Sequence, residues 1–191
     1  NFITRQYTTG GYVALDGTQQ FTYFDGDYNV AAKVASGNTT ITFFGGYNGK
    51  EYSGDQYEKN ETFHFKEGDM MRNYKQTGGT NKSNQEYAQM NIATRKQKYM
   101  LSEKITLVRN ENPGSTTTGV LTTSYGAAPS ESFSRNKQSN LMPKVNLYGN
   151  FDITDKQYLE VTVMGSYSKN KYLYEYQLDG FTTSTDSKED A

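Results

Sequence analysis

Hydrophobic and polar residues alternate with a period of two along most of the chain, and no segment shows the period of an amphipathic helix. Tyr, Thr and Val are frequent in the alternating segments, as is typical of strands. The pattern predicts an all-β, antiparallel fold of about eight strands. The predicted strands cover Ile3–Ala14, Thr22–Ala35, Thr39–Tyr52, Glu86–Thr94, Tyr99–Arg109, Val120–Tyr125, Lys144–Ile153 and Tyr158–Tyr176.

Three short turns interrupt these strands at a regular interval of 59 residues. They are Ser36–Thr39, Arg95–Lys98 and Thr154–Gln157. The intervening connections are longer, polar and rich in Gly, Asn, Ser and Thr, which predicts solvated loops. These predicted loops are Ser53–Gln85, Asn110–Gly119 and Gly126–Asn140. Short turns at one end and long loops at the other are typical of an outer-membrane β-barrel.

Folding the first hairpin about Gly37-Asn38 tests this prediction, because a one-residue slip would move every side chain to the other face. In this arrangement Val34 lies opposite Ile41, and Lys33 and Thr42 lie on the other face. One face of the hairpin is therefore predicted to be apolar and the other polar.

The third hairpin, folded about Lys156, separates apolar and polar residues in the same way and places Phe151 opposite Val161. The middle hairpin places Ile92 opposite Leu101 but brings Glu103 onto the apolar face. A carboxylate there would be costly against lipid. We therefore expect a local register shift, or a contact between Glu103 and a neighbouring strand.

Composition supports a barrel wall. The chain has 17 Tyr and 10 Phe, a net charge of −1 and no Cys. Aliphatic residues are too few for the core of an ordinary soluble domain of this length, whereas a barrel wall needs only one apolar face. The absence of Cys excludes disulfides and thiolate chemistry, and the balanced charge argues against a nucleic-acid partner. Tyrosines near the predicted loops fit an aromatic girdle at the membrane interface.

Several segments resemble barrel strands of TonB-dependent outer-membrane receptors of the Bacteroidota. They are Phe24–Asn29, Glu86–Asn91, Gln157–Val161 and Gly165–Tyr172. The resemblance covers most of the chain and identifies residues 1–191 as one partial β-barrel domain from the middle of such a receptor. The plug domain, the TonB box and the barrel ends of that family have no counterpart in the sequence.

The resemblance implies energised uptake of a nutrient across the outer membrane of a Gram-negative bacterium. The nutrient would be a glycan, a peptide, a siderophore or a vitamin complex. The implied partners are outer-membrane lipid, the extracellular ligand, a surface lipoprotein, and the TonB complex acting through the plug. Under this interpretation the predicted turns are periplasmic and the predicted loops extracellular.

Aromatic residues in the first predicted loop are the candidate ligand-binding residues, because aromatic faces beside Asn and Asp suit sugars and peptides. They are Tyr57, Phe63, Phe65 and Tyr74. Packing of the loop on itself is the simpler interpretation of these four side chains.

No catalytic residue, metal site or cofactor is predicted. His64 is the only His, and a lone His without Cys does not make an ordinary zinc site. The run from Asp25 to Asn29 begins like a calcium loop but has Val30 and Ser36 where an EF-hand requires Gly and Glu. A different calcium site involving Asp16, Asp25 and Asp27 is an alternative to a simple turn. The acidic residues Glu51, Asp55, Glu58 and Glu61 lie among lysines, so solvated charge explains them.

The sequence thus predicts a non-catalytic segment of a receptor. Two other kinds of protein would show the same alternation of apolar and polar residues. The first is a soluble β-sandwich that serves as a glycan-binding or adhesin module, with the apolar faces forming its core. The second is an all-β enzyme acting on polysaccharide, for which no catalytic residues are apparent.

Overall fold

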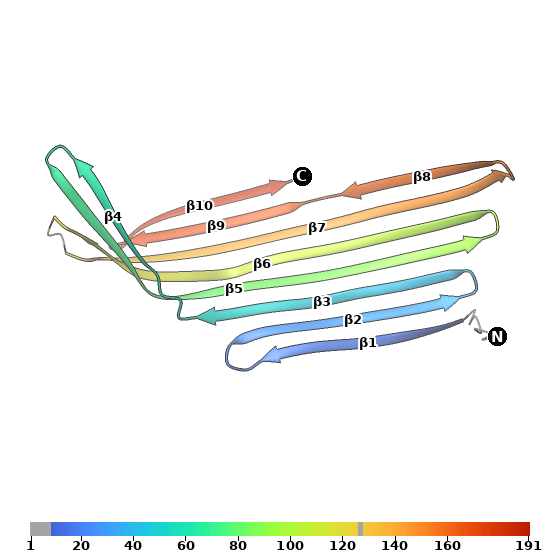
Figure 1. Cartoon of the computed structure of the whole chain (residues 1–191), viewed down its shortest axis with the longest axis horizontal. Helices are drawn as coiled ribbons and strands as arrows, with labels where there is room; N and C mark the ends of the chain where they lie inside the picture. The colour runs from blue at the N-terminus through green and yellow to red at the C-terminus, as the bar shows by residue number, and fades with distance from the viewer. Residues whose placement is uncertain (1–8, 126–127) are drawn as a thin grey trace.

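The computed structural model describes residues 9–125 and 128–191, and it confirms an all-β antiparallel fold (Figure 1). The predicted strand Ile3–Ala14 lies partly outside the described residues. No helix in the described part of the chain is long and apolar enough to span a membrane. The strands are β1 (Thr9–Gln20), β2 (Phe24–Ser36), β3 (Thr39–Ser53), β4 (Glu58–Phe65), β5 (Gly68–Lys96), β6 (Tyr99–Thr123), β7 (Ser130–Thr154), β8 (Gln157–Ser166), β9 (Lys169–Leu178) and β10 (Phe181–Asp190).

The ten strands form one sheet in the order β1-β2-β3-β5-β6-β7-β9-β10, with β4 also on β5 and β8 also on β7. β3 and β4 keep one continuous register against β5, with Ser53 opposite Thr80 and Glu58 opposite Lys75. β8 and β9 share one register against β7 in the same way. The ten strands therefore occupy eight positions across the sheet. The sheet is open rather than closed into a barrel, because β1 and β10 lie at opposite ends of this order.

The three short turns lie at the same end of the sheet, on the right in Figure 1. In the first hairpin, the predicted register is confirmed, with Val34 opposite Ile41. In the other two hairpins the predicted register is wrong by two residues. Thr94 rather than Ile92 lies opposite Leu101, and Leu159 rather than Val161 lies opposite Phe151. A shift of two preserves the face on which every side chain lies.

The predicted long loops are largely wrong. Residues 58–65 and 68–85 belong to β4 and β5, residues 110–119 belong to β6, and β7 begins at Ser130. The segments Tyr99–Arg109 and Val120–Tyr125, predicted as two strands, are largely joined in β6. Sequence patterning missed these extensions because polar residues lie on both of their faces, so no apolar alternation marks them.

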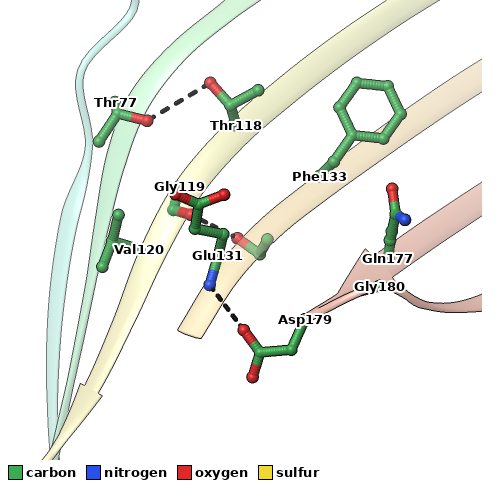
Figure 2. Close-up of a pocket in the computed structure, with 10 residues that line it drawn as sticks. Thr77, Thr118, Gly119, Val120, Glu131, Phe133, Gln177, Asp179 and Gly180 are labelled. Atoms are coloured by element: carbon green, nitrogen blue, oxygen red, sulfur yellow. Dashed lines mark hydrogen bonds between the residues drawn. The ribbon is translucent and has the colours of Figure 1, made fainter. Parts of the chain in front are cut away.

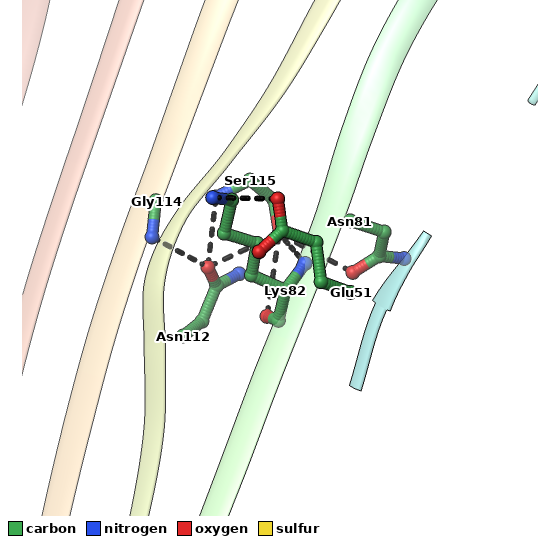
Figure 3. Close-up of polar contacts among 6 residues, drawn as sticks. All are labelled: Glu51, Asn81, Lys82, Asn112, Gly114 and Ser115. Atoms are coloured by element: carbon green, nitrogen blue, oxygen red, sulfur yellow. Dashed lines mark hydrogen bonds and ion pairs between the residues drawn. The ribbon is translucent and has the colours of Figure 1, made fainter. Parts of the chain in front are cut away.

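A bulge carries β6 past Pro113, which cannot donate a ladder hydrogen bond. The Oδ1 atom of Asn112 accepts hydrogen bonds from the backbone N–H groups of Gly114, at 3.0 Å, and Ser115, at 2.8 Å (Figure 3). Gly114 has φ 145°, a conformation that favours glycine. The register between β6 and β7 shifts at this point. Pro113 and Gly114, which lie in a segment predicted to be a loop, therefore occupy a bulge within a continuous strand.

Pro143 explains the break between β8 and β9. It lies inside β7, opposite Leu107 of β6, and its carbonyl accepts a hydrogen bond from the N–H of Tyr167 at 3.0 Å. Pro143 has no N–H to donate in return. The ladder therefore weakens between Ser166 and Lys169, and one long strand becomes two.

One face of the sheet is apolar, and we call the hydrophobic residues on this face the apolar band. Cross-strand partners point to the same side of a sheet, so the pairings define its faces. The apolar band consists of Val13, Leu15, Val30, Ala32, Val34, Ile41, Phe43, Ala88, Met90, Ile92, Leu101, Ile105, Leu107, Val145, Leu147, Val161 and Val163. Among the described residues no hydrophobic side chain is buried. Within the described residues the band is therefore an uncovered surface.

Glu103 lies within the apolar band, between Ile92 on β5 and Leu147 on β7. The pairing of β5 with β6 is regular from Asn84 to Lys96, so the predicted local register shift at Glu103 is wrong. The described residues contain no ion pair that involves Glu103. The carboxylate is thus held on the apolar face by the register of its neighbours.

Candidate functional site

The face opposite the apolar band carries a row of five amide side chains on five adjacent positions of the sheet. Asn48, Gln85, Asn110, Asn140 and Asn170 are consecutive cross-strand partners on β3, β5, β6, β7 and β9. We call these residues the amide row. The Nε2 group of Gln85 donates a hydrogen bond to Oδ1 of Asn110 at 2.8 Å. Each amide offers both donors and acceptors, so the row presents polar groups of both kinds.

A groove of about 440 Å³ runs along part of this row. Its lining includes four of the five amides, together with Asn112 and Gln138. The Oδ1 atoms of Asn140 and Asn170 are buried and have no hydrogen-bond partner in the described part of the chain. Buried polar atoms are normally paired with protein or water. The amide row thus has hydrogen-bonding capacity that the sheet itself does not use.

Tyrosines on β9 continue this polar face toward the end of the sheet opposite the three short turns, which we call the loop end. Tyr172, Tyr174 and Tyr176 alternate along β9 on the same face as Asn170. Tyr174 lies opposite Asn136 of β7, whose buried Oδ1 atom also lacks a partner among the described residues. Burial, followed by the neighbouring hydroxyls of Tyr174 and Tyr74, raises the pKa of Tyr176 above its usual value.

The four predicted aromatic residues do not lie in a single loop. Phe63 and Phe65 lie in β4 and Tyr74 lies in β5, while Tyr57 directly precedes β4. Register places all four on one face of the β4–β5 ribbon, because Tyr57 pairs with Gln76, Phe63 with Met70 and Phe65 with Gly68. The structure thus brings these side chains to a shared face.

Contacts distinguish the four aromatic residues. The rings of Tyr57 and Tyr74 lie 6.3 Å apart, and the ring of Tyr74 lies over Gly119, where a Cβ atom would come within 2.6 Å of it. Phe63 lies beneath the guanidinium of Arg72 at 5.1 Å. Phe65 is 53% exposed and lies near the tip of the ribbon. Tyr74 is the one most closely packed against the main sheet.

An ion network holds β4 on β5 beside these rings. The Nε group of Arg72 donates to Oε2 of Glu61 at 2.8 Å, and Lys59 pairs with Glu61 at 2.5 Å. Hydrogen bonds from Lys59 and then Arg72 lower the pKa of the Glu61 carboxyl, and the Glu61 carboxylate raises the pKa of Lys59. The network is partly exposed to solvent and links β4 to β5 through Glu61 and Arg72.

The other sequence candidates do not assemble into a site. His64 pairs with Asp69 at 2.7 Å, and both side chains are exposed. Asp25 pairs with Lys50 at 3.6 Å. No group of three or more His, Cys, Asp or Glu side chains in the described ranges is arranged to hold a metal ion. The calcium alternative with Asp16, Asp25 and Asp27 therefore has no support in the geometry.

A second cavity, of about 510 Å³, lies at the loop end between β6, β7 and the turn after β9 (Figure 2). The Asp179 carboxylate accepts a hydrogen bond from the backbone N–H of Glu131 at 3.0 Å and closes one side of it. Ser132, which is 7% exposed, donates to the carbonyl of Gly119 at 3.2 Å. These contacts hold the ends of β6, β7 and β9 together.

Sequence reasoning did not identify the amide row. Its members lie 25 to 37 residues apart in the chain, and no motif connects them. They become neighbours only through the register of β3, β5, β6, β7 and β9. No protein-family model matches the sequence, and a search of curated proteins finds no match.

Proposed function

We propose that this chain forms part of the wall of an outer-membrane β-barrel receptor that takes up a nutrient in a Gram-negative bacterium. In this proposal the apolar band meets lipid and the face with the amide row lines the lumen. The uncovered apolar band carries the proposal, because it extends over seven positions of the sheet while no hydrophobic side chain of the described residues is buried. A wall with lipid on one side and water on the other needs no packed core.

The height of the apolar band supports a membrane-spanning role. Along β6 the band lies between Tyr99 and Arg109, which are ten residues apart. At about 3.3 Å per residue and a tilt of about 40°, this length spans about 25 Å of bilayer. Aromatic residues lie at both limits on the same face: Phe151 is the partner of Tyr99, and the rings of Tyr28 and Tyr47 stack at 6.5 Å. Such belts are typical of the membrane interfaces.

The edges of the sheet set a requirement for this proposal. A lipid-exposed sheet must have no unpaired edge within the hydrocarbon, because every backbone polar group there needs a partner. β1 and β8 both present an outer edge at the height of the apolar band, with Leu15 at 79% and Met164 at 75% exposure. Under the proposal, further strands pair with both edges and close the wall.

The polar face is consistent with a ligand path. Amide side chains and tyrosine rings together offer hydrogen bonds and stacking faces to a polar nutrient, of the glycan, peptide, siderophore or vitamin classes. Energy for uptake would come from the TonB complex acting through a plug, and a surface lipoprotein would assist capture. The proposed role is binding and transport, without catalysis by this chain.

The soluble alternative, a glycan-binding or adhesin sandwich, requires a second sheet packed against the apolar band. The described residues form a single sheet. No observation on the described part of the chain therefore favours the sandwich over the wall.

Single cysteines on neighbouring residues provide the test, since the chain contains no Cys. Val145 lies in the apolar band and Asn146 on the opposite face. A solvatochromic nitrobenzoxadiazole label is attached to Val145→Cys or Asn146→Cys in the protein as cells produce it, in its membrane. We expect blue-shifted emission, quenched by lipid-borne nitroxides, for Val145→Cys alone. Equal emission and quenching at the two positions, or no association with membrane, would overturn the proposal.

A further inference from the structure

Three lysines gather on the same face as the apolar band, just beyond its loop-side limit. Lys171 on β9 and Lys188 on β10 are direct cross-strand partners. Lys137 on β7 lies in the next row, opposite Leu173 of β9. The three side chains line one groove of about 340 Å³. We call this groove the lysine groove.

The charges of the lysine groove are not balanced by the sheet. Like charges placed directly opposite each other destabilise a strand pair. The described residues contain no ion pair that involves Lys137, Lys171 or Lys188. Two carboxylates also line the groove: Glu111, which pairs with Arg109 at 2.7 Å, and Asp186. The groove therefore holds more positive than negative charge, and an anion would relieve the repulsion.

The position of the lysine groove along the membrane normal indicates the source of this anion. Lys171 lies opposite Ser139 of β7. Ser139 is four residues from Pro143 in the direction of the loop end, and Pro143 lies in the part of the apolar band nearest that end. Four residues correspond to about 13 Å along the strand and, after tilt, about 10 Å of depth. On the lipid-facing side, this is the level of the headgroups rather than of the hydrocarbon. Leu173 adds an apolar contact within the same groove.

We propose that the lysine groove binds the phosphate group of an anionic lipid headgroup in the leaflet on the loop side. This inference rests on the proposed function, because it requires the apolar band to face lipid. Ammonium groups donate strong, charge-assisted hydrogen bonds to phosphate oxygens. Basic pockets at the membrane surface select anionic headgroups by this chemistry. The carboxylate of Asp186 opposes binding, so Asp186→Asn should strengthen it.

Spin-labelled lipids provide the test. The protein is placed in phosphatidylcholine vesicles with spin-labelled phosphatidylglycerol or spin-labelled phosphatidylcholine, and electron paramagnetic resonance measures the fraction of each lipid that the protein immobilises. The groove variant changes Lys137, Lys171 and Lys188 to Gln. The matched control changes Lys33, Lys104 and Lys144 to Gln. These three lysines are exposed on the opposite face, and changing them to Gln removes the same amount of charge as the groove variant does.

We expect the unaltered protein to immobilise phosphatidylglycerol in preference to phosphatidylcholine. The groove variant should reduce this preference about five-fold or more, since one lysine near an anionic surface contributes a factor of about five. The control variant should retain it. Equal immobilisation of both lipids by the unaltered protein, or equal loss in both variants, would overturn this inference while leaving the proposed function intact.

Two further outcomes separate the remaining possibilities. If inorganic phosphate at moderate concentration abolishes the preference, the groove is a site for free phosphate and the lipid assignment is wrong. If neither lipid is immobilised at all, the apolar band does not face lipid, and the proposed function fails together with this inference.

Discussion

A lysine introduced into the apolar band should destabilise the protein far more than one introduced at the next residue. Ile105 lies in the band, between Met90 of β5 and Val145 of β7. Thr106 lies on the opposite face of the same strand, between Gln89 and Lys144. Both residues are half-buried, so Ile105→Lys and Thr106→Lys differ mainly in the face to which the charge is added.

The position of Ile105 in the structure sets the magnitude. It lies four residues from Arg109 and six from Tyr99, the limits of the band on β6. Under the proposed function, these separations correspond after tilt to about 10 Å and about 15 Å of bilayer depth, which places Ile105 close to the midplane. A Lys at the midplane costs about 2 to 4 kcal/mol. We expect the free energy of unfolding to fall by that amount, which lowers the folding equilibrium constant about 30-fold to 900-fold.

Urea titration of the two variants in lipid vesicles, followed by circular dichroism, measures this difference. Thr106→Lys should change the free energy of unfolding by less than about 1 kcal/mol, since its ammonium group enters water and its repulsion from the partner Lys144 is itself below about 1 kcal/mol. Equal destabilisation by the two substitutions would refute the assignment of the faces. A small effect of Ile105→Lys in vesicles would refute the lipid contact, even if the two values differed.

Three other substitutions test the surroundings of single residues. Glu103→Leu should raise the free energy of unfolding in vesicles, because it removes a carboxylate from the apolar band; unchanged or lower stability would show that Glu103 is compensated. Gly119→Val should displace the Tyr74 ring, which leaves no space for a Cβ atom, and should speed hydrogen exchange in β4 and β5; unaltered exchange would contradict this packing. The lowered pKa of Glu61 means that the folded chain favours the charged carboxylate. The charged carboxylate therefore stabilises the folded chain above the usual carboxyl pKa, and this stabilisation is lost as pH falls through the lowered pKa. Glu61→Gln should therefore remove an acid-dependent step in hydrogen exchange of the β4–β5 ribbon, and an identical acid step in that variant would refute it.

The assignment of side chains to faces was predictable from the sequence. Because the period of a strand is two, alternation determines the faces of the first hairpin, while the two-residue turn Gly37-Asn38, with Ser36 opposite Thr39, determines its register. At the other two turns, the pairings differ from the predicted ones because the centre of each turn lies one residue away from the predicted position. Lys96 pairs with Tyr99, and a register shift between Asp152 and Thr154 precedes the pairing of Thr154 with Gln157. Lys96 stays in β5 with its ammonium 5.6 Å from the ring of Tyr99, and Thr154 stays in β7 and accepts a hydrogen bond from the N–H of Lys156.

The extent of the strands was not predictable by the same reasoning. Residues 68–85 and 110–119 carry mostly polar side chains and several Gly, and the second segment contains Pro113, so local signals indicate loops. They form strands because neighbouring backbones supply the hydrogen-bond partners, and because bulges accommodate Pro113 and Gly114. The candidate aromatic residue Tyr74 is consequently on a strand, packed over Gly119, rather than on a solvated loop.

The sequence by itself determined that this protein is all-β, antiparallel and apolar on one face, because alternation is a local property that each strand carries alone. Only the tertiary structure decided which residues of different strands become neighbours. The amide row joins Asn48 to Asn170 across five strands, and the lysine groove joins Lys137, Lys171 and Lys188 across three. Their proximity depends on the register of every intervening pair and on each bulge, and these depend on backbone partners that are distant in the chain.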